Sequence, residues 1–390
     1  MDAPTIQQIL IQGYGEYDQS TPLPPHIRQA ARSLMACRTK ALGGHKQSCP
    51  DDHFHRIWYN SCKHRMCPQC DFLQIQQWLE KQKARILSCD HFHVIFTIPS
   101  ELRFLWHFNV KFMTQLLFTS ARDTLFELLG DATYMGGTPG LIASLHTWTK
   151  TMLLHPHIHC LVTGSGLSKD GQWKTAKKDF LLPYGVIRNV FRRNVRRGLL
   201  KALEKGNLKL PEGRQPQQVI NLLNKLGRKK WNVKICEKYS HGNGVLTYLA
   251  RYLRGGPISN KRIIHADKSG VMINYGRKKR EVMTLPVQEF IKRLLQHTPL
   301  PHSVHVRSYG LYASARADAL NTSRKLLGQG PVMAAKKIHW QDCFCQSTSH
   351  PEQCPICGKR LVVSAYFKPV LNVNRSGAPP PPLIFHNNAA

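Results

Sequence analysis

The chain has 390 residues, of which 42% are hydrophobic and 9% aromatic, so it fits two or three ordinary globular domains rather than a disordered protein. Its charge is unusual, because 55 Lys and Arg residues stand against 23 Asp and Glu residues and give a net charge of +32. This excess favours a polyanionic partner, and nucleic acid is the natural candidate. No apolar run reaches the roughly 18 residues of a membrane span, and the start of the chain lacks a signal-peptide core, so we expect a cytoplasmic protein without a membrane partner.

Nine of the 12 cysteines fall in two clusters, and in a reducing compartment such clusters bind metal more often than they form disulfides. The first cluster occupies residues 37–70 and contains Cys67-Pro-Gln-Cys70, a spacing at which two thiolates reach one tetrahedral zinc ion. One structural zinc ion is indicated and two are possible, and further ligands could come from Asp52, His53, His55 or His64. The candidate zinc ligands of this cluster are Cys37, His45, Cys49, Cys62, Cys67 and Cys70.

Alternating helical and strand patterns follow the first cysteine cluster. Residues 73–87 have helical spacing of their apolar side chains, and residues 91–100 form a β-branched and aromatic run that predicts a strand. Residues 103–130 return to a helical pattern. Two strands are predicted over residues 140–150 and 153–164, and the short turn between them indicates a β-hairpin.

Histidines recur at every second position of the strand LLHPHIHCLVTG, residues 153–164. Because side chains alternate between the two faces of a strand, His155, His157 and His159 share one face while apolar residues occupy the other. Pairing across the hairpin turn places His146 opposite this row. We therefore expect a divalent ion bound by His157, His159 and His146. His155 is expected to lie outside the ligand set.

Three later segments concentrate positive charge. A helical pattern covers residues 186–205, a basic stretch with Trp231 leads into a strand at 227–239, and residues 275–280 form a basic loop. Neighbouring basic and aromatic side chains suit single-stranded nucleic acid, because phosphates pair with cations while bases stack on rings. The alternative for each charge run is an ordinary solvated face. The candidate DNA-binding residues are Arg192, Arg193, Arg196, Arg197, Arg228, Lys229, Lys230, Arg277, Lys278, Lys279 and Arg280.

Residues 240–256 predict a turn followed by a helix with an apolar stripe. Tyr248 and Tyr252 are four residues apart and therefore lie on the same side of this helix. Taken alone, the pair fits two amphipathic rings that bridge core and surface. A further helix is predicted over residues 285–297.

The second cysteine cluster covers residues 343–360 and ends in Cys354-Pro-Ile-Cys357, again the spacing of a zinc knuckle. Cys343 and Cys345 are the expected partners of this pair, and His350 could replace one thiolate. The tail RSGAPPPPLIFHNNAA, residues 375–390, is rich in proline, and we expect it to be disordered.

The histidine face, the tyrosine pair and the excess of positive charge together fit chemistry on a phosphodiester. A divalent ion held by histidines keeps positions open for phosphate oxygens and acts as a Lewis acid. A Tyr hydroxyl, whose ordinary pKa is near 10, can attack phosphorus polarised in this way. Two other readings remain open: a non-enzymatic zinc-dependent nucleic-acid-binding protein and a metal-dependent nuclease that uses water. The tyrosine pair beside the histidine strand favours covalent chemistry over both.

The order of these motifs resembles a known family. The stretches HPHIHCLVTGSGLS and VLTYLARYLRGGPISN, preceded by CRTKALGGH and YNSCKHRMCPQC and followed by VHVRSYGLYA, resemble the two-tyrosine transposases of the HUH superfamily. These enzymes move bacterial insertion sequences by a rolling-circle route. The resemblance extends over residues 28–320.

The resemblance implies roles for four of the residues already singled out. His157 and His159 would be ligands of a catalytic Mg2+ or Mn2+ ion, while the third ligand, His146, rests on the hairpin pairing. Tyr248 and Tyr252 would form 5′-phosphotyrosine links to single-stranded DNA at the element ends and at the target. The resemblance also implies structural Zn2+ and an α+β fold, in which an antiparallel HUH nuclease sheet of four or five strands, flanked by helices, follows an N-terminal zinc-binding domain.

The chain departs from the family pattern at two positions. Relatives usually have a second Cys three residues after Cys49, where this chain has Asp52, and a His at the position of Met66. The first cluster can therefore hold a single ion or borrow His53. Combining the motifs, we expect a helical and zinc-binding domain at 1–72, an HUH domain at 73–320, a zinc knuckle region at 321–365 and a disordered tail at 366–390, in a bacterial, nucleoid-associated protein.

Overall fold

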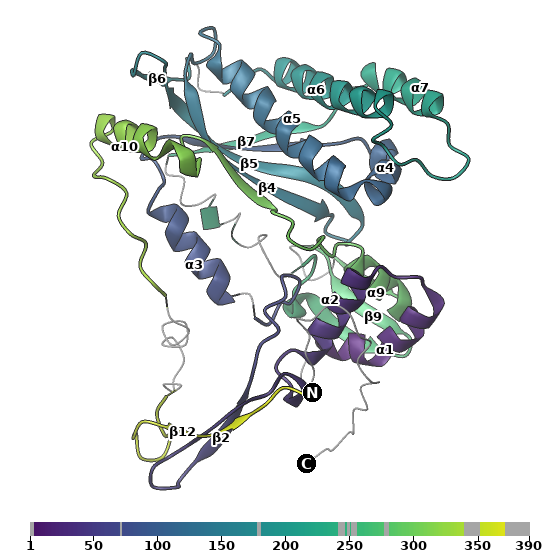
Figure 1. Cartoon of the computed structure of the whole chain (residues 1–390), viewed down its shortest axis with the longest axis vertical. Helices are drawn as coiled ribbons and strands as arrows, with labels where there is room; N and C mark the ends of the chain where they lie inside the picture. Colours follow the sequence, from purple (N-terminus) through teal and green to yellow (C-terminus); the bar gives the residue numbers. More distant parts are fainter. Residues whose placement is uncertain are drawn as a thin grey trace.

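The structure, a computed structural model, combines helices with antiparallel sheets (Figure 1), which confirms the predicted α+β class. It describes residues 4–70, 72–177, 181–240, 246–247, 250, 256–276, 281–338 and 352–370. The largest sheet contains β3 (His91–Thr97), β4 (Thr138–Trp148), β5 (Leu154–Leu167), β6 (Trp173–Thr175), β7 (Val233–Tyr239) and β11 (Val306–Gly310). Its strand order is β11-β4-β5-β3-β7, and β6 pairs with β5, so the described residues contribute six strands to it where four or five were implied.

β4 and β5 form the predicted hairpin. Their antiparallel pairing sets His146 opposite His157 and Ser144 opposite His159. The register expected from the hairpin turn is therefore confirmed. Ile158 and Cys160 alternate with the histidines along β5 and are fully buried on the opposite face. This alternation leaves the imidazoles together on one side of the sheet.

Helices cover both faces of the six-stranded sheet. On the face of Ile158 and Cys160 lie α4 (Arg103–Phe108), α5 (Val110–Gly130), α6 (Tyr184–Glu204) and α7 (Pro216–Gly227), which share one hydrophobic core with it. On the histidine face, Leu161 packs with Leu79 of α3 (Phe72–Lys83) and Leu320 of α10 (Ala317–Leu326). Figure 1 shows α5 and α6 on one side of the strands and α3 and α10 on the other.

The helical pattern of residues 103–130 is interrupted at Asn109, which separates α4 from α5. The Asn109 side chain donates to the carbonyls of Leu105 and Lys209 and accepts from the amide of Lys209. These hydrogen bonds replace helical ones and attach the loop before α7 to this point. The helical pattern predicted for residues 103–130 is therefore confirmed, but as two helices, because periodicity does not reveal such a long-range contact.

A second group of elements packs beside the tip of the β4–β5 hairpin. It comprises α1 (Ile6–Ser20), α2 (Pro25–Ala36), β8 (Ile263–Asp267), β9 (Gly270–Asn274), β10 (Val282–Leu285) and α9 (Val287–Leu295), which share a core. The strand order is β10-β9-β8. Helices α1 and α9 approach closely at Gly13, where an added Cβ would lie 2.5 Å from Cγ1 of Val287. A larger side chain at Gly13 would therefore force these helices apart.

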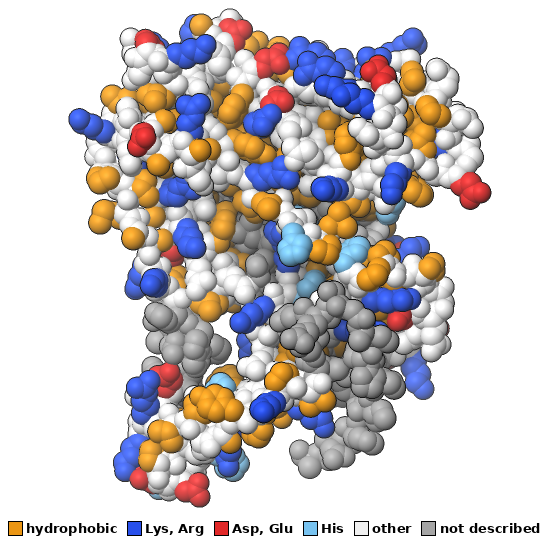
Figure 2. All heavy atoms as spheres, in the orientation of Figure 1, with side chains coloured by type: hydrophobic (Ala, Val, Ile, Leu, Met, Phe, Trp, Pro, Cys, Tyr) orange, Lys and Arg blue, Asp and Glu red, His pale blue; other side chains and the backbone are white. Residues whose placement is uncertain are grey.

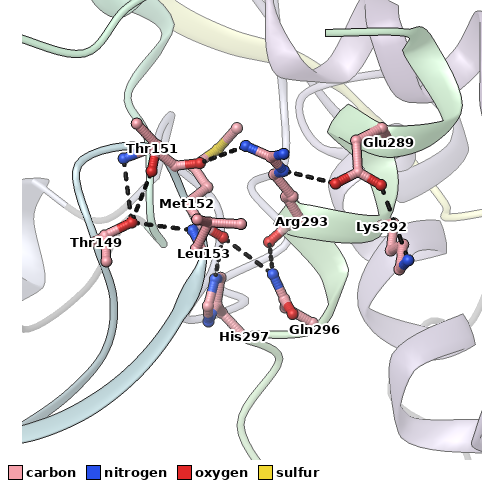
Figure 3. Close-up of polar contacts among 9 residues, drawn as sticks. All are labelled: Thr149, Thr151, Met152, Leu153, Glu289, Lys292, Arg293, Gln296 and His297. Atoms are coloured by element: carbon pink, nitrogen blue, oxygen red, sulfur yellow. Dashed lines mark hydrogen bonds and ion pairs between the residues drawn. The ribbon is translucent and has the colours of Figure 1, made fainter. Parts of the chain in front are cut away.

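The turn of the β4–β5 hairpin is fixed to α9 by a set of hydrogen bonds (Figure 3). His297 contacts the hydroxyl of Thr147 at 3.0 Å and the carbonyl of Met152 at 2.9 Å. Arg293 donates to the carbonyl of Thr151, and Gln296 donates to that of Met152. The Met152 side chain is fully buried in the core formed with α9. The turn that joins the two histidine strands is therefore anchored to α9 and to the two residues that follow it.

A small sheet lies at the end of the molecule away from α5 and α6 (Figure 1). It contains β1 (Gly44–Ser48), β2 (His55–Tyr59) and β12 (Val362–Phe367) in the order β12-β1-β2. Single 3-10 turns occur at Lys40–Leu42, Ser100–Leu102, Asn260–Arg262 and Ser314–Arg316. Within the described ranges, every helix is too short or too polar to cross a bilayer.

Candidate metal centres and nuclease site

Three histidines converge on one face of the β4–β5 hairpin. One ring nitrogen each from His146, His157 and His159 lies within 4.8 Å of the others. The ring centroids of His146 and His159 are 4.1 Å apart, and those of His157 and His159 are 4.8 Å apart. The cross-strand pairing of His146 with His157 produces this geometry, because directly opposite side chains project from the same face. Three neutral imidazoles at this spacing fit one divalent ion.

Hydrogen bonds orient two of these rings. Nδ1 of His157 donates to the carbonyl of His155, which leaves Nε2 of His157 for a metal. Nδ1 of His159 lies 2.8 Å from Nε2 of His93, on the neighbouring strand β3. When Nε2 of His159 binds an ion, its Nδ1 carries the proton and donates to His93. Such outer hydrogen bonds set the tautomer and the angle of a metal-binding imidazole.

Burial keeps these imidazoles neutral. It lowers the pKa of His157 to about 4 and that of His93 to about 4. For His146 and His159, burial also takes the pKa well below its ordinary value, and the neighbouring histidines lower it further. A neutral imidazole is the form that binds metal, so the group is ready for an ion at neutral pH.

The segment predicted to carry the tyrosines meets the histidine face. Leu246 and Ala250 are buried, and they belong to the cluster that contains Leu161 of β5. Leu161 shares a face with His157 and His159 because strand positions two and four apart point the same way. Tyr248 and Tyr252 themselves lie outside the described residues.

A first cysteine group is formed by Cys37, Cys62, Cys67 and Cys70. The sulfurs of Cys37 and Cys67 are 3.5 Å apart, and those of Cys62 and Cys70 are 3.7 Å apart. Tetrahedral zinc with bonds of 2.3 Å places its sulfurs roughly 3.8 Å apart. The four thiols therefore fit one structural zinc ion, with ligands only from the first cysteine cluster of the sequence.

A second group combines both cysteine clusters of the sequence. It consists of Cys49, His53, Cys354 and Cys357, whose ligand atoms lie within 4.8 Å of one another. The sulfurs of Cys49 and Cys357 are 3.5 Å apart, and Nδ1 of His53 is 4.0 Å from the Cys49 sulfur. Three thiols and one imidazole form an ordinary donor set for structural zinc.

Three of the predicted zinc ligands do not belong to either group in the described part of the chain. His45 lies on β1, where its ring is 6.4 Å from that of Tyr366, and it joins neither group. Cys343 and Cys345 lie outside the described residues.

Comparison with known proteins matches two parts of the chain to transposase families. Residues 140–319 match the family described as "Putative transposase", and residues 9–98 match the "Transposase zinc-binding domain". A "Putative transposase y4qJ" from Sinorhizobium fredii is 33% identical over 368 residues, which cover 90% of this chain and 92% of that protein. The chain belongs to this transposase family.

A second relative extends the comparison to an insertion sequence. The transposase for insertion sequence element IS801 of Pseudomonas savastanoi pv. phaseolicola is 25% identical over 356 residues, covering 86% of this chain and 83% of the relative. DNA is therefore a partner of this transposase, and zinc is a component of its N-terminal region.

The basic residues of the transposase lie mainly away from the histidine group. Arg192, Arg193, Arg196 and Arg197 lie on α6, on the opposite face of the sheet, and Arg228, Lys229 and Lys230 follow α7. Arg193 forms an ion pair with Glu127, and Lys229 forms one with Glu101. Figure 2 shows Lys and Arg side chains over the whole visible face, with few acidic ones. Arg277, Lys278, Lys279 and Arg280 lie outside the described residues.

Sequence analysis missed the contribution of β3 to the histidine site. His91 and His93 repeat the alternating pattern of β5 in the stretch HFHVIF, and that pattern could have revealed them. The two have different environments. His91 contacts the hydroxyl of the buried Tyr312 at 2.7 Å, so it belongs to the core, whereas His93 contacts His159. Lys234 is paired with Ile95 of β3, and it adds an exposed cation near His93.

Proposed function

We propose that this transposase cleaves single-stranded DNA at the ends of its insertion sequence and rejoins it at a target by a rolling-circle route. The observation that carries the proposal is the group of His146, His157 and His159 on the sheet face where Leu246 and Ala250 pack. In the sequence, Tyr248 lies between Leu246 and Ala250, and Tyr252 follows two residues later. The packing of these two neighbours supports a tyrosine segment that lies on the face of the histidine group.

Tyr248 and Tyr252 are the proposed nucleophiles. The phenol oxygen of one tyrosine forms a bond to phosphorus and loses its proton, while the bond to the 3′ oxygen breaks and that oxygen is protonated. The resulting 5′-phosphotyrosine retains the energy of the phosphodiester, so a 3′-hydroxyl can reverse the exchange and rejoin strands. A second tyrosine permits a second transfer before the first is resolved. A Mg2+ or Mn2+ ion bound by the histidines would act as a Lewis acid on the phosphate oxygens.

A denaturing gel tests the proposal directly. Purified protein is mixed with a labelled single-stranded oligonucleotide that contains the element end, with Mn2+, with Mg2+ or with chelator. We expect a metal-dependent shifted band that protease removes. Because imidazole nitrogens bind Mn2+ better than Mg2+, we expect half-maximal adduct at a lower Mn2+ concentration.

Three other outcomes have definite meanings. Cleavage that leaves free 5′-phosphate ends and no protein adduct would show that water is the nucleophile. Binding of the oligonucleotide without cleavage in any metal would support a non-enzymatic DNA-binding role. Cleavage that is undiminished in excess chelator would refute the role of the histidine group.

A further inference from the structure

The second group of zinc ligands joins two distant parts of the chain. Cys49 and Cys357 are 308 positions apart in the sequence, yet their sulfurs are 3.5 Å apart. His53 and Cys354 complete the set of four ligand atoms. The match to the transposase zinc-binding domain ends at residue 98, so half of this donor set lies beyond that domain.

Each half of the group is preorganised by its own backbone. The amide of Cys49 donates to the carbonyl of Phe54 at 2.8 Å, which closes a turn that contains His53. On the other half, the amide of Cys354 donates to the carbonyl of Lys359 at 2.8 Å, and the amide of Gly358 donates to the carbonyl of Cys354. Gly358 has a φ of 73°, the left-handed conformation that such a knuckle turn needs. Both halves therefore present their ligands before a metal arrives.

Polar contacts connect the two halves but bury little surface. β12 pairs with β1 along Gly44–Ser48, and the hydroxyls of Ser48 and Ser364 are 2.9 Å apart. Lys359 forms an ion pair with Asp51, and both side chains are exposed to solvent, so this pair contributes little to stability. Strand pairing at an open edge needs a further source of stability to remain in place.

Apolar burial does not supply this stability. The side chains of β12 are largely exposed, with Val362 at 51% and Tyr366 at 81% relative exposure. The local hydrophobic cluster consists of Cys49, Cys354 and Leu361, with Phe54 packed against it. A segment with so small a core is usually held by a disulfide or a metal ion. The sulfur spacing fits metal ligands, because the 3.5 Å between Cys49 and Cys357 far exceeds a disulfide bond.

We propose that one zinc ion bound by Cys49, His53, Cys354 and Cys357 fastens residues 352–370 to the N-terminal zinc-binding domain. Relatives usually have a Cys ligand at the position of Asp52, and in this chain His53 then supplies the ligand in its place. In Figure 1, α10 packs on the nuclease sheet while β12 joins β1 and β2 at the opposite end of the molecule. The zinc ion thus connects the zinc-binding domain to the nuclease sheet a second time, through the chain that follows α10.

Zinc stoichiometry distinguishes one shared ion from two separate ones. Zinc per chain is measured for the full-length protein carrying His157→Ala, so that the histidine group does not contribute. We expect Cys49→Ser and Cys354→Ser each to lose one ion, and the double variant to lose the same single ion. Cys89→Ser, which changes a cysteine outside all three groups, is the matched control and should lose none. Loss of two ions in the double variant would overturn the proposal.

A second result would overturn it equally. If Cys343→Ser with Cys345→Ser removed the ion while Cys49→Ser retained it, the C-terminal cysteines would form their own site.

A cleavage experiment tests whether the zinc ion holds the C-terminal segment to the zinc-binding domain. A specific protease site is inserted after Met333, which is 72% exposed, and the cut protein is analysed by gel filtration. We expect the C-terminal fragment to remain bound in the wild type and in His53→Cys, which preserves a zinc ligand. It should separate in His53→Ala and in Cys354→Ser. Retention of the fragment in Cys354→Ser would show that the strand pairing holds it without zinc.

Discussion

Nε2 of His93 lies 2.8 Å from Nδ1 of His159, so a histidine of β3 contacts a proposed metal ligand of β5. His93→Ala removes the group that fixes the tautomer and the angle of the His159 ring. We expect the Mn2+ concentration for half-maximal adduct formation to rise about 10- to 100-fold, with a smaller change in the rate at saturating Mn2+. Metal titration of adduct formation measures both quantities.

The control for this experiment is His265→Ala, which changes an exposed histidine on β8. Its metal dependence should equal that of the wild type. An unchanged half-saturating Mn2+ concentration in His93→Ala would show that His93 serves only the packing of the sheet.

The tyrosine pair gives a second prediction. We expect Tyr248→Phe together with Tyr252→Phe to abolish the covalent adduct, because the phenol oxygen that would bond to phosphorus is gone. Binding of the oligonucleotide should change little, since the rings remain. Each single variant should retain adduct formation through the other hydroxyl. Any adduct in the double variant would assign the nucleophile to a different residue.

Buried His297 gives a pH dependence of stability. Burial lowers its pKa to about 4, against an ordinary value of about 6.5 in the unfolded chain. Between these values the unfolded chain binds more protons, so the free energy of unfolding falls as pH is lowered from about 6.5 to about 4. Relative to His297→Gln, the free energy of unfolding of the wild type should fall by about 3 kcal/mol over this pH range, since each pKa unit corresponds to about 1.36 kcal/mol.

Urea unfolding at a series of pH values measures how the free energy of unfolding changes with pH. Comparing the wild type with His297→Gln cancels the contribution of the zinc ligands, because both proteins contain them. His302→Gln, at an exposed position, should follow the wild type. Parallel curves for the wild type and His297→Gln would show that His297 is protonated equally in the folded and unfolded states.

The arginines of α6 give a prediction about DNA affinity. Arg196→Gln with Arg197→Gln should weaken binding of single-stranded DNA and lower the slope of log K against log salt by about 0.7 for each phosphate that is no longer neutralised. The cleavage rate at saturating DNA should remain the same, because α6 covers the face opposite the histidine group. Fluorescence anisotropy across a salt series measures the slope. Lys268→Gln, in the exposed turn after β8, is the control for loss of positive charge. If the α6 double variant and Lys268→Gln have equal salt slopes, α6 does not contact the DNA.

The sequence by itself determined the elements whose signal is local. The period-two pattern in β5 predicted a strand with a histidine face, and the turn length predicted the pairing of His146 with His157. Apolar periodicity likewise predicted α6 and α9 close to their observed limits. These features depend on residues a few positions apart, whose spacing decides which side chains share a face.

Tertiary structure alone decided which distant elements meet. It brought Cys357 to Cys49, His93 to His159, and α9 to the tip of the β4–β5 hairpin. It also placed the α6 arginines on the side of the sheet away from the histidines. Each of these contacts depends on how preformed strands and helices bury their apolar faces against one another. That packing is a property of the whole chain, and no short spacing pattern in the sequence encodes it.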